Sequence, residues 1–174
     1  MSSPLVFNVV KLLRGSGMPE QRTQSGQADE RIGVQMIAIE PGTPVTVDAT
    51  LTPLGEGIMV DATVTATLTG QCSRCLTTLH PDYEVSVNEV FAATDTFIQG
   101  EDAEDDDDVP QVAGDTIDLT QSLIDAVGLD LPFNPVCDYF GLECGDAEVP
   151  APDGVSGEED ERPDPRWAGL EKFK

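Results

Sequence analysis

Positive charge is scarce in this 174-residue chain, and its distribution disfavours one large class of function. The sequence has 9 Lys and Arg against 33 Asp and Glu, a formal net charge of -24. Between residues 32 and 161, Arg74 is the only cation against 28 acidic residues, a net of -27. Nucleic-acid affinity rests mostly on neutralising phosphates with Lys and Arg. Autonomous RNA or DNA binding by this region is therefore disfavoured, and a basic protein partner is favoured.

Long apolar runs, cysteines and aromatic residues are also few. No run approaches the roughly 18 apolar residues of a membrane span, and the start MSSPLVFNVVKLL has neither a basic region nor a small-residue cleavage site. We therefore expect a soluble cytoplasmic protein that does not enter a membrane. With 5% aromatic residues and 13 prolines, the core should be modest and part of the chain disordered. Four cysteines are too few for a secreted disulfide scaffold, so they should be metal ligands, redox thiols or core residues.

Apolar and polar residues alternate with period two along three segments, 45–51, 60–68 and 83–91. This pattern, rich in β-branched residues, is typical of paired strands. It predicts an α+β fold that is mainly an antiparallel β-sheet, either a meander or a partly open barrel, with the sequence CSRC at one of its turns. A further strand is expected at 5–13, followed by a mobile Gly- and Gln-rich loop at 14–31.

The second half of the chain predicts one or two packed helices and two acidic segments. Residues 99–115 form an acidic linker in which like charges repel. A helix should follow, with Asp118 as N-cap, Gln121 in a capping box and a stop at Gly128. The chain is expected to be a single α+β domain over 1–144, followed by a flexible acidic tail at 145–174. A short turn is expected in that tail at Asp164-Pro165-Arg166-Trp167.

The cysteines offer a candidate metal site. Cys72 and Cys75 have the two-residue separation that lets two thiolates bind one zinc ion from a single turn, and Cys137 and Cys144 can complete a tetrahedral set. His80 is an alternative ligand. Free or packed thiols remain open as a second interpretation, and a redox pair as a third.

An enzyme is the less favoured class. The C-x-x-C motif also occurs in thiol oxidoreductases, where a helix N-terminus lowers the pKa of the nucleophile. The flanks of CSRC are strand-like, and the surrounding acids raise thiol pKa values. The sequence has no Ser-His-Asp set and no phosphate-binding Gly loop, and its carboxylates cluster in segments that would not hold them in place. No catalytic residue is therefore assigned.

Four segments in order resemble a known family: CSRCL at 72–76, the acidic linker, GDTIDLTQSLIDAVGLDLPFNPVC at 114–137, and DPRWAGLEKF at 164–173. Together they are similar to the YceD-type large ribosomal RNA subunit accumulation proteins, in an actinobacterial form. The family's C-x-R-C falls on residues 72–75 and its L-P-x-x-P-x-C on residues 131–137. Where members with a full second cysteine cluster have several closely spaced cysteines, this chain has DYFGLECG with Cys144 alone.

The resemblance implies a non-enzymatic factor for the synthesis, processing or stability of 23S rRNA. We expect it to act through a basic ribosomal protein of the large subunit or another rRNA-processing factor, and to associate with rRNA indirectly. The candidate partner-binding residues are Arg74, Asp105, Asp106, Asp107, Asp108 and Trp167. The other interpretation of Arg74 is a plain surface charge, and that of Trp167 is a packed aromatic residue. The alternative function is a zinc-stabilised RNA-binding module that uses Arg74 with Arg14, Arg22 and Arg31.

Overall fold

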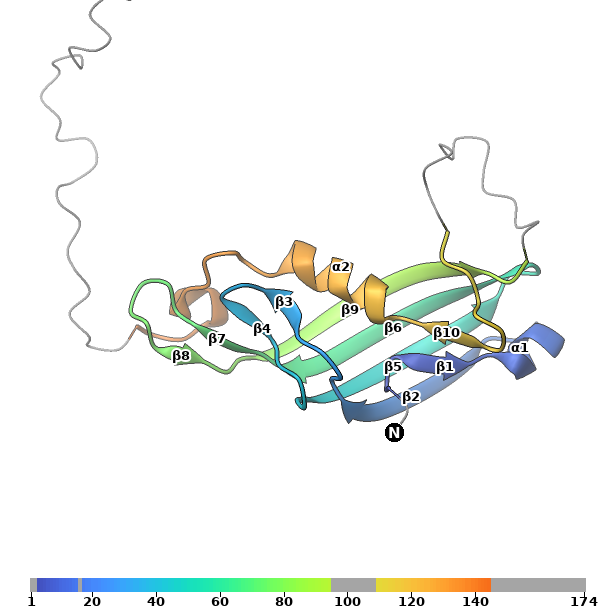
Figure 1. Ribbon diagram of the computed structural model, residues 1–174, viewed down its shortest axis with the longest axis horizontal. Coiled ribbons are helices and arrows are strands. Elements are labelled where there is room, and N and C mark those ends of the chain that lie inside the picture. Colours follow the sequence, from blue (N-terminus) through green and yellow to red (C-terminus); the bar gives the residue numbers. More distant parts are fainter. Residues whose placement is uncertain (1–2, 16, 95–108, 145–174) are drawn as a thin grey trace, which may run out of the picture.

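The computed structural model describes residues 3–15, 17–94 and 109–144, in which a long antiparallel sheet carries a helix and shorter strands on one face (Figure 1). In chain order the elements are β1 Val6–Asn8, α1 Val10–Arg14, β2 Glu20–Gln27, β3 Ile32–Val34, β4 Ile37–Ile39, β5 Pro44–Pro53, β6 Gly57–Thr67, β7 Thr69–Gln71, β8 Thr78–Leu79, β9 Asp82–Ala92, β10 Thr116–Asp118, α2 Thr120–Asp130 and the 3-10 helix η1 Cys137–Phe140. The expected α+β class, mainly antiparallel, is confirmed, and the sheets of these residues are open rather than closed into a barrel.

The main sheet has the strand order β2-β5-β6-β9, with every pair antiparallel. Its inner face holds the alternating apolar side chains that the sequence indicated. These buried residues are Val45, Val47, Ala49, Leu51, Val60, Ala62, Val64, Tyr83, Val85 and Val87. Each fully buried Val or Leu side chain favours folding by roughly 1.5–3 kcal/mol. The period-two pattern therefore fixed both the pairing and the buried face.

A single hairpin register runs through β6, β7, β8 and β9. The pairs run without a slip from Gly57↔Ala92 through Thr67↔Asp82 to Gln71↔Thr78, and the Leu68 N–H donates to the Pro81 carbonyl at 2.9 Å where one sheet passes into the other. Beyond that point the hairpin joins the second sheet, of order β3-β4-β7-β8. The CSRC sequence lies at its tip, so the predicted meander with CSRC at a turn is confirmed.

Close backbone packing places the hairpin tip against β4. A Cβ atom on Gly70 would lie 2.6 Å from Ile37 Cγ1, closer than real Cβ atoms approach their neighbours. Glycine at this position therefore lets β7 pair with β4, where Gly70 lies opposite Ile37. The outer half of the hairpin, with its cysteines, is held at one end of the molecule (Figure 1).

The inner face of the main sheet is covered by α2 and by the two-stranded β1-β10 sheet. Leu123 and Val127 of α2, with Phe7 of β1 and Ile117 of β10, are fully buried in one core. The helix contacts β9 and β3. Its C-terminal end points toward the cysteine end of the molecule (Figure 1). No helix in the described ranges is long and apolar enough to cross a bilayer.

The structure differs from the expected mobile loop at 14–31, because β2 forms an eight-residue edge strand within it. This strand has no apolar side chain, so hydrophobic periodicity could not reveal it. Its inward residues instead make polar or close contacts with the N-terminal segment. Gln24 Nε2 donates to the Val6 carbonyl at 3.3 Å, and a Cβ on Gly26 would meet the Pro4 ring at 3.0 Å.

Element boundaries differ in two further places. The expected strand at 5–13 is the short β1 followed by α1. The α2 helix passes through Gly128 and ends before Pro132, where Leu131 adopts extended geometry that a following proline favours. The N-cap is Leu119 rather than the expected Asp118, which ends β10 and accepts the Thr120 N–H at 2.9 Å. Gln121 bonds to Asp125 at 3.0 Å, so the expected capping box does not form.

Part of the expected acidic linker is ordered. The Ala92 N–H donates to the Pro110 carbonyl at 2.9 Å, and the Val112 N–H donates to the Ala92 carbonyl at 2.8 Å, so the chain returns beside the end of β9. The acidic run 101–108 and the tail 145–174, with the expected turn at 164–167, lie outside the described residues.

Candidate metal centre

The hairpin tip presents Cys72 and Cys75 on one side of a tight turn. The Leu76 N–H donates to the Cys72 carbonyl at 2.9 Å, and the Cys72 N–H donates to the Thr77 carbonyl at 2.8 Å. The Cys75 N–H points back at Cys72 Sγ, 3.5 Å away. These bonds fix both sulfurs to the same side of the loop, the arrangement that a C-x-x-C metal turn requires.

Leu76 occupies the position where the sequence lacks the glycine usual after such a turn. Its backbone adopts the left-handed conformation, with φ 61°, and among non-glycine residues of the described chain no other has positive φ. This conformation costs an L-residue roughly 1–2 kcal/mol. Gln71 Nε2 donates to the Leu76 carbonyl at 3.0 Å, which helps to hold the turn. The turn geometry is thus kept without the glycine.

Cys137 and Cys144 come from the segment after α2. Cys137 begins η1, and Gly141, at φ 68°, ends it in the left-handed conformation and turns the chain back. The Leu142 N–H donates to the Cys137 carbonyl at 2.9 Å, closing this loop. The Ser73 N–H donates to the Pro135 carbonyl at 2.8 Å, so the two cysteine-bearing segments are joined by backbone as well.

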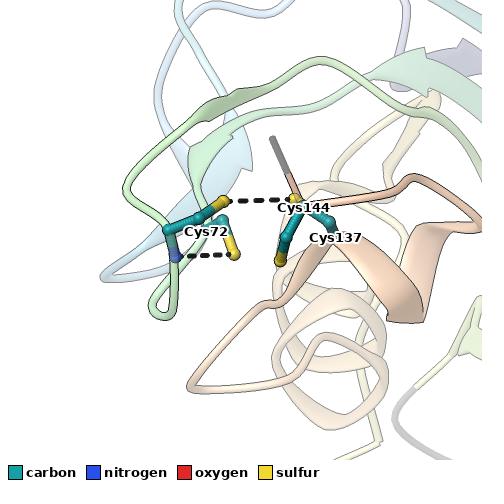
Figure 2. A group of neighbouring side chains, drawn as sticks. Cys72, Cys137 and Cys144 are labelled. Atoms are coloured by element: carbon teal, nitrogen blue, oxygen red, sulfur yellow. Dashed lines mark hydrogen bonds between the residues drawn. The ribbon is translucent and has the colours of Figure 1, made fainter. Parts of the chain in front are cut away.

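The four sulfurs converge between these segments (Figure 2). All four lie within 4.8 Å of one another, and Cys75 Sγ and Cys137 Sγ are 3.6 Å apart. Four sulfurs at about 2.3 Å from a zinc ion are about 3.8 Å apart. All four cysteines are free, and Cys72 and Cys137 are buried. The donor set and spacing therefore fit a closed four-thiolate metal centre, the type that structural zinc sites use.

The thiols of the group differ in acidity. The pKa of Cys75 is lowered to about 6, chiefly by its hydrogen bond with the Thr77 hydroxyl, 3.3 Å away. The pKa of Cys72 is lowered chiefly by the backbone N–H of Cys75. Burial raises the pKa of Cys137 to about 12, and the Cys75 sulfur raises that of Cys144. The hairpin tip thus favours thiolates, while the second pair holds protons that a metal ion would displace.

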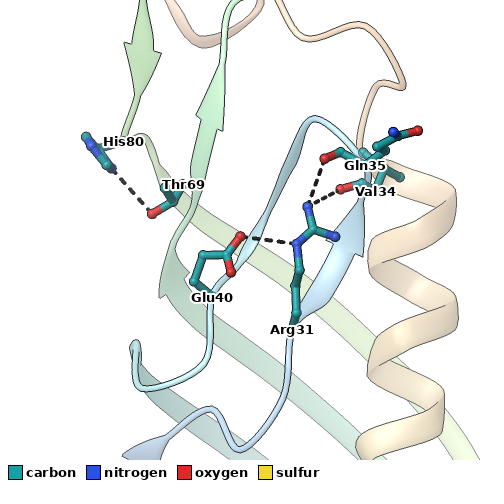
Figure 3. A network of polar contacts seen from close by, with 6 residues as sticks. All are labelled: Arg31, Val34, Gln35, Glu40, Thr69 and His80. Carbon is teal, nitrogen blue, oxygen red and sulfur yellow. Dashed lines mark hydrogen bonds and ion pairs between the residues drawn. The ribbon is translucent and has the colours of Figure 1, made fainter.

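Sequence reasoning found the four cysteines but not the groups that orient them. Thr77, which acidifies Cys75, and the Pro135 carbonyl, which ties the two segments together, had no signal beyond their closeness to the motifs C-x-x-C and L-P-x-x-P-x-C. His80, the alternative ligand, is exposed and outside the sulfur group; its Nδ1 lies 3.4 Å from the Thr69 hydroxyl (Figure 3). Arg74 is exposed at the hairpin tip.

The expected basic patch for RNA does not form among the described residues. Arg22 pairs with Glu20 at 2.7 Å and also donates to the Asn8 carbonyl. Arg31 pairs with Glu40 at 3.1 Å and donates to two carbonyls of the β3–β4 turn (Figure 3). Arg14 ends α1, at the end of the molecule opposite the Arg74 hairpin (Figure 1). The four arginines therefore do not converge on one surface. Asp105, Asp106, Asp107, Asp108 and Trp167 lie outside the described residues.

The protein is thus a small, mainly antiparallel β domain with four cysteines gathered at one end. In a comparison with protein families, the family model named "Large ribosomal RNA subunit accumulation protein YceD" matches residues 60–174. The chain therefore belongs to the YceD family, and the resemblance seen in the sequence is confirmed.

Curated relatives agree with an actinobacterial form of the family. An uncharacterized protein of Mycobacterium tuberculosis is 37% identical over 172 residues, covering 98% of this chain and 81% of that protein. One of Mycobacterium leprae is 38% identical, covering 97% and 76%. The Bacillus subtilis protein YlbN, also uncharacterized, is 33% identical, covering 75% and 74%. No solved structure matches.

The strained turn residue gives a first prediction. Replacing Leu76 by glycine should raise the unfolding free energy by about 1 kcal/mol, because glycine adopts positive φ without the Cβ clash. The side chain is 63% exposed, so little packing is lost. Urea denaturation of the metal-free protein measures the change. Leu54→Gly, at a partly exposed turn without positive φ, is the control and should destabilise; a Leu76→Gly variant that destabilises equally would contradict the assignment.

The acidity of Cys75 gives a second prediction. In metal-free protein, the rate of Cys75 alkylation should rise with pH and reach half its maximum near pH 6, because the thiolate is the reactive form. Mass spectrometry of the modified peptide reads the rate. Thr77→Val removes the hydroxyl and should move the midpoint upward. A midpoint near 9 in both proteins would show that Thr77 does not acidify Cys75.

Proposed function

We propose that the protein is a non-enzymatic ribosome-biogenesis factor that supports 23S rRNA through contact with a basic protein of the large subunit, acts in the cytoplasm, and is stabilised by zinc at Cys72, Cys75, Cys137 and Cys144. Membership of a family named for accumulation of large ribosomal RNA is the observation that carries the biological role. The position of the sulfur group supports the zinc. It joins the tip of a hairpin to a segment 62 residues further along the chain.

The described residues support a non-catalytic role. Apart from the cysteines and Tyr83, whose hydroxyl bonds to Asp130, no side chain with a polar or charged group in the described ranges is buried. Catalytic acids, bases and anion-stabilising groups work when a shielded environment holds them in place. The polar side chains of the described residues are instead mostly exposed or partly exposed, which suits a surface that binds another macromolecule.

The exposed face of the main sheet supports a cationic partner. Asp48, Asp61, Asp82 and Glu84 point outward among threonine, serine and glutamine side chains, while the arginine of β2 faces inward. A surface of one sign attracts partners of the opposite sign and raises their rate of association. It repels phosphate in the same way, so contact with rRNA should run through the partner.

Redox chemistry is a second candidate, favoured by the acidic Cys75 thiol and its 3.6 Å distance to the Cys137 sulfur. These two observations also describe a metal site before loading. CSRC lies between two strands rather than at a helix N-terminus, so the dipole that activates many redox cysteines is missing here. The metal interpretation accounts for all four sulfurs, whereas a redox pair accounts for two.

Zinc binding is tested by native mass measurement of the full chain before and after chelation. We expect one zinc ion per chain, and a lower thermal midpoint once it is removed, because the ion closes two segments that are distant in sequence. Cys144→Ser should lose most of the bound zinc. Cys72→Ser should lose it as well, and the matched control Ser73→Ala should retain it. A chain that carries no metal and keeps its thermal midpoint after chelation would contradict a structural zinc.

Partner binding is tested by retention of purified large-subunit ribosomal proteins on the immobilised protein. Retention should fall several-fold between about 0.05 M and 0.5 M salt, since screening lengths shorten from over 10 Å to under 5 Å. The quadruple variant with Asp105, Asp106, Asp107 and Asp108 changed to Asn should bind less, while the control Asp29→Asn/Glu30→Asn should bind nearly as well as the wild type.

The same assay with naked 23S rRNA discriminates between the functions. We expect no retention of rRNA at about 0.15 M salt in the absence of protein partners. Binding of naked rRNA under these conditions would favour the RNA-binding module, and retention of ribosomal proteins that is indifferent to salt would contradict electrostatic capture.

A further inference from the structure

A shallow groove of about 400 Å³ runs between the edge strand β9 and the C-terminal half of α2. Its lining is Glu84, Val85 and Ser86 from β9 and Ala126, Leu129 and Asp130 from α2. Leu129 is 89% exposed, and it is the most exposed large apolar side chain of the described residues. Val85, Ala126 and Leu129 give the groove an apolar lining, and it is bordered by Asp130 and, at the edge of the sheet, by Glu84.

The rim has an uncompensated negative charge. The last turn of α2 contains no basic residue and ends at Asp130, and Asp125 lies five residues before it. The exposed carbonyl groups at a helix C-terminus carry partial negative charge and favour cations. Asp130 accepts a hydrogen bond from the Tyr83 hydroxyl at 2.8 Å, which holds the carboxylate at the mouth of the groove. A ligand for this groove should combine apolar side chains with positive charge.

The chain itself contains a segment of that chemistry. Residues 162–174 hold four of the nine cations of the protein, Arg162, Arg166, Lys172 and Lys174. The apolar residues Trp167, Leu170 and Phe173 recur there at intervals of three, a spacing that places them along one side of a helical turn. Between residue 32 and this segment, Arg74 is the only other cation. The apolar and basic residues of this segment therefore complement the apolar and acidic residues of the groove.

The segment can reach the groove. The last described residue, Cys144, lies in the cysteine group beside η1, at the end of the molecule toward which the C-terminal end of α2 points (Figure 1). Seventeen residues separate it from Arg162. A chain of that length spans roughly 20–25 Å on average and up to about 60 Å when extended. A short tether of this kind gives an effective concentration in the millimolar range.

We propose that the C-terminal segment 162–174 docks in cis in the groove between β9 and α2, with Trp167 against Leu129 and its cations facing Glu84 and Asp130. The mode is that of an amphipathic segment laid into an apolar groove. A basic partner that reached the same rim would have to displace this segment. The docking is independent of the proposed function, because it concerns the isolated chain.

Trp167 is the only tryptophan of the protein, so its fluorescence reports on the docking directly. In the full-length chain we expect emission at shorter wavelength than in the urea-unfolded chain, and a several-fold smaller quenching constant with iodide or acrylamide. Leu129→Lys and Glu84→Lys should both shift the emission toward the unfolded value, since one removes the apolar contact and both add positive charge at the groove. Asp61→Lys makes the same charge change as Glu84→Lys on the outer face of β6 and should leave the emission unchanged.

The exposed positions of these substitutions make loss of folding easy to separate from loss of docking. Far-UV circular dichroism should be unchanged in all three variants, and each should still unfold in one cooperative transition; loss of docking can lower the thermal midpoint only by the stability that docking adds. Emission of the wild type that equals that of the unfolded chain would overturn the proposal. A shielded tryptophan whose emission is unchanged by Leu129→Lys and Glu84→Lys would also overturn it, because Trp167 would then be buried somewhere other than the groove. Shielding that disappears on dilution would assign the groove to the tail of a second copy and overturn docking in cis.

Discussion

The convergence of four sulfurs between a hairpin tip and the segment after α2 is the interaction on which the cysteine end of this molecule depends. The second buried cluster there is small, with Cys72, Leu79 and Cys137 at its centre and a few partly buried side chains around it. So little apolar area does not by itself hold two segments distant in sequence. The backbone hydrogen bond from Ser73 to Pro135, together with the sulfur group itself, supplies what the apolar contacts lack. The main core, by contrast, is continuous and needs no such help.

Much of the sheet could be predicted because burial on one face imposes period two. Val45 to Leu51 and Val60 to Val64 follow that rule, and both runs are strands with those side chains inside. The edge strand β2 could not be predicted in this way, because its inward residues are not apolar. Arg22, Gln24 and Gly26 contact the N-terminal segment through polar groups and close packing. The end of α2 was predicted wrongly because Pro132 determines it, whereas Gly128 is tolerated inside the helix.

The candidate site was predictable in its ligands but not in its setting. Spacing singled out Cys72 and Cys75, and counting singled out Cys137 and Cys144, although six residues separate the second pair. Only folding could show that η1 and the left-handed Gly141 bring that wide spacing to one point. The position after the first pair is occupied by Leu76 rather than glycine, and Leu76 adopts the required left-handed backbone itself. Sequence patterns record residue types, and both outcomes depend on backbone conformation.

The unbroken register of the long hairpin constrains how this protein can vary in length. Cys72 is placed by a ladder whose far end is the Gly57↔Ala92 pair. Side chains alternate between the faces of a strand, so an insertion of one residue in either arm would turn every later side chain to the opposite face. The arms can therefore lengthen only together and by two residues at a time. The length of the ladder therefore sets the distance between the thiol groups of the hairpin tip and the main core.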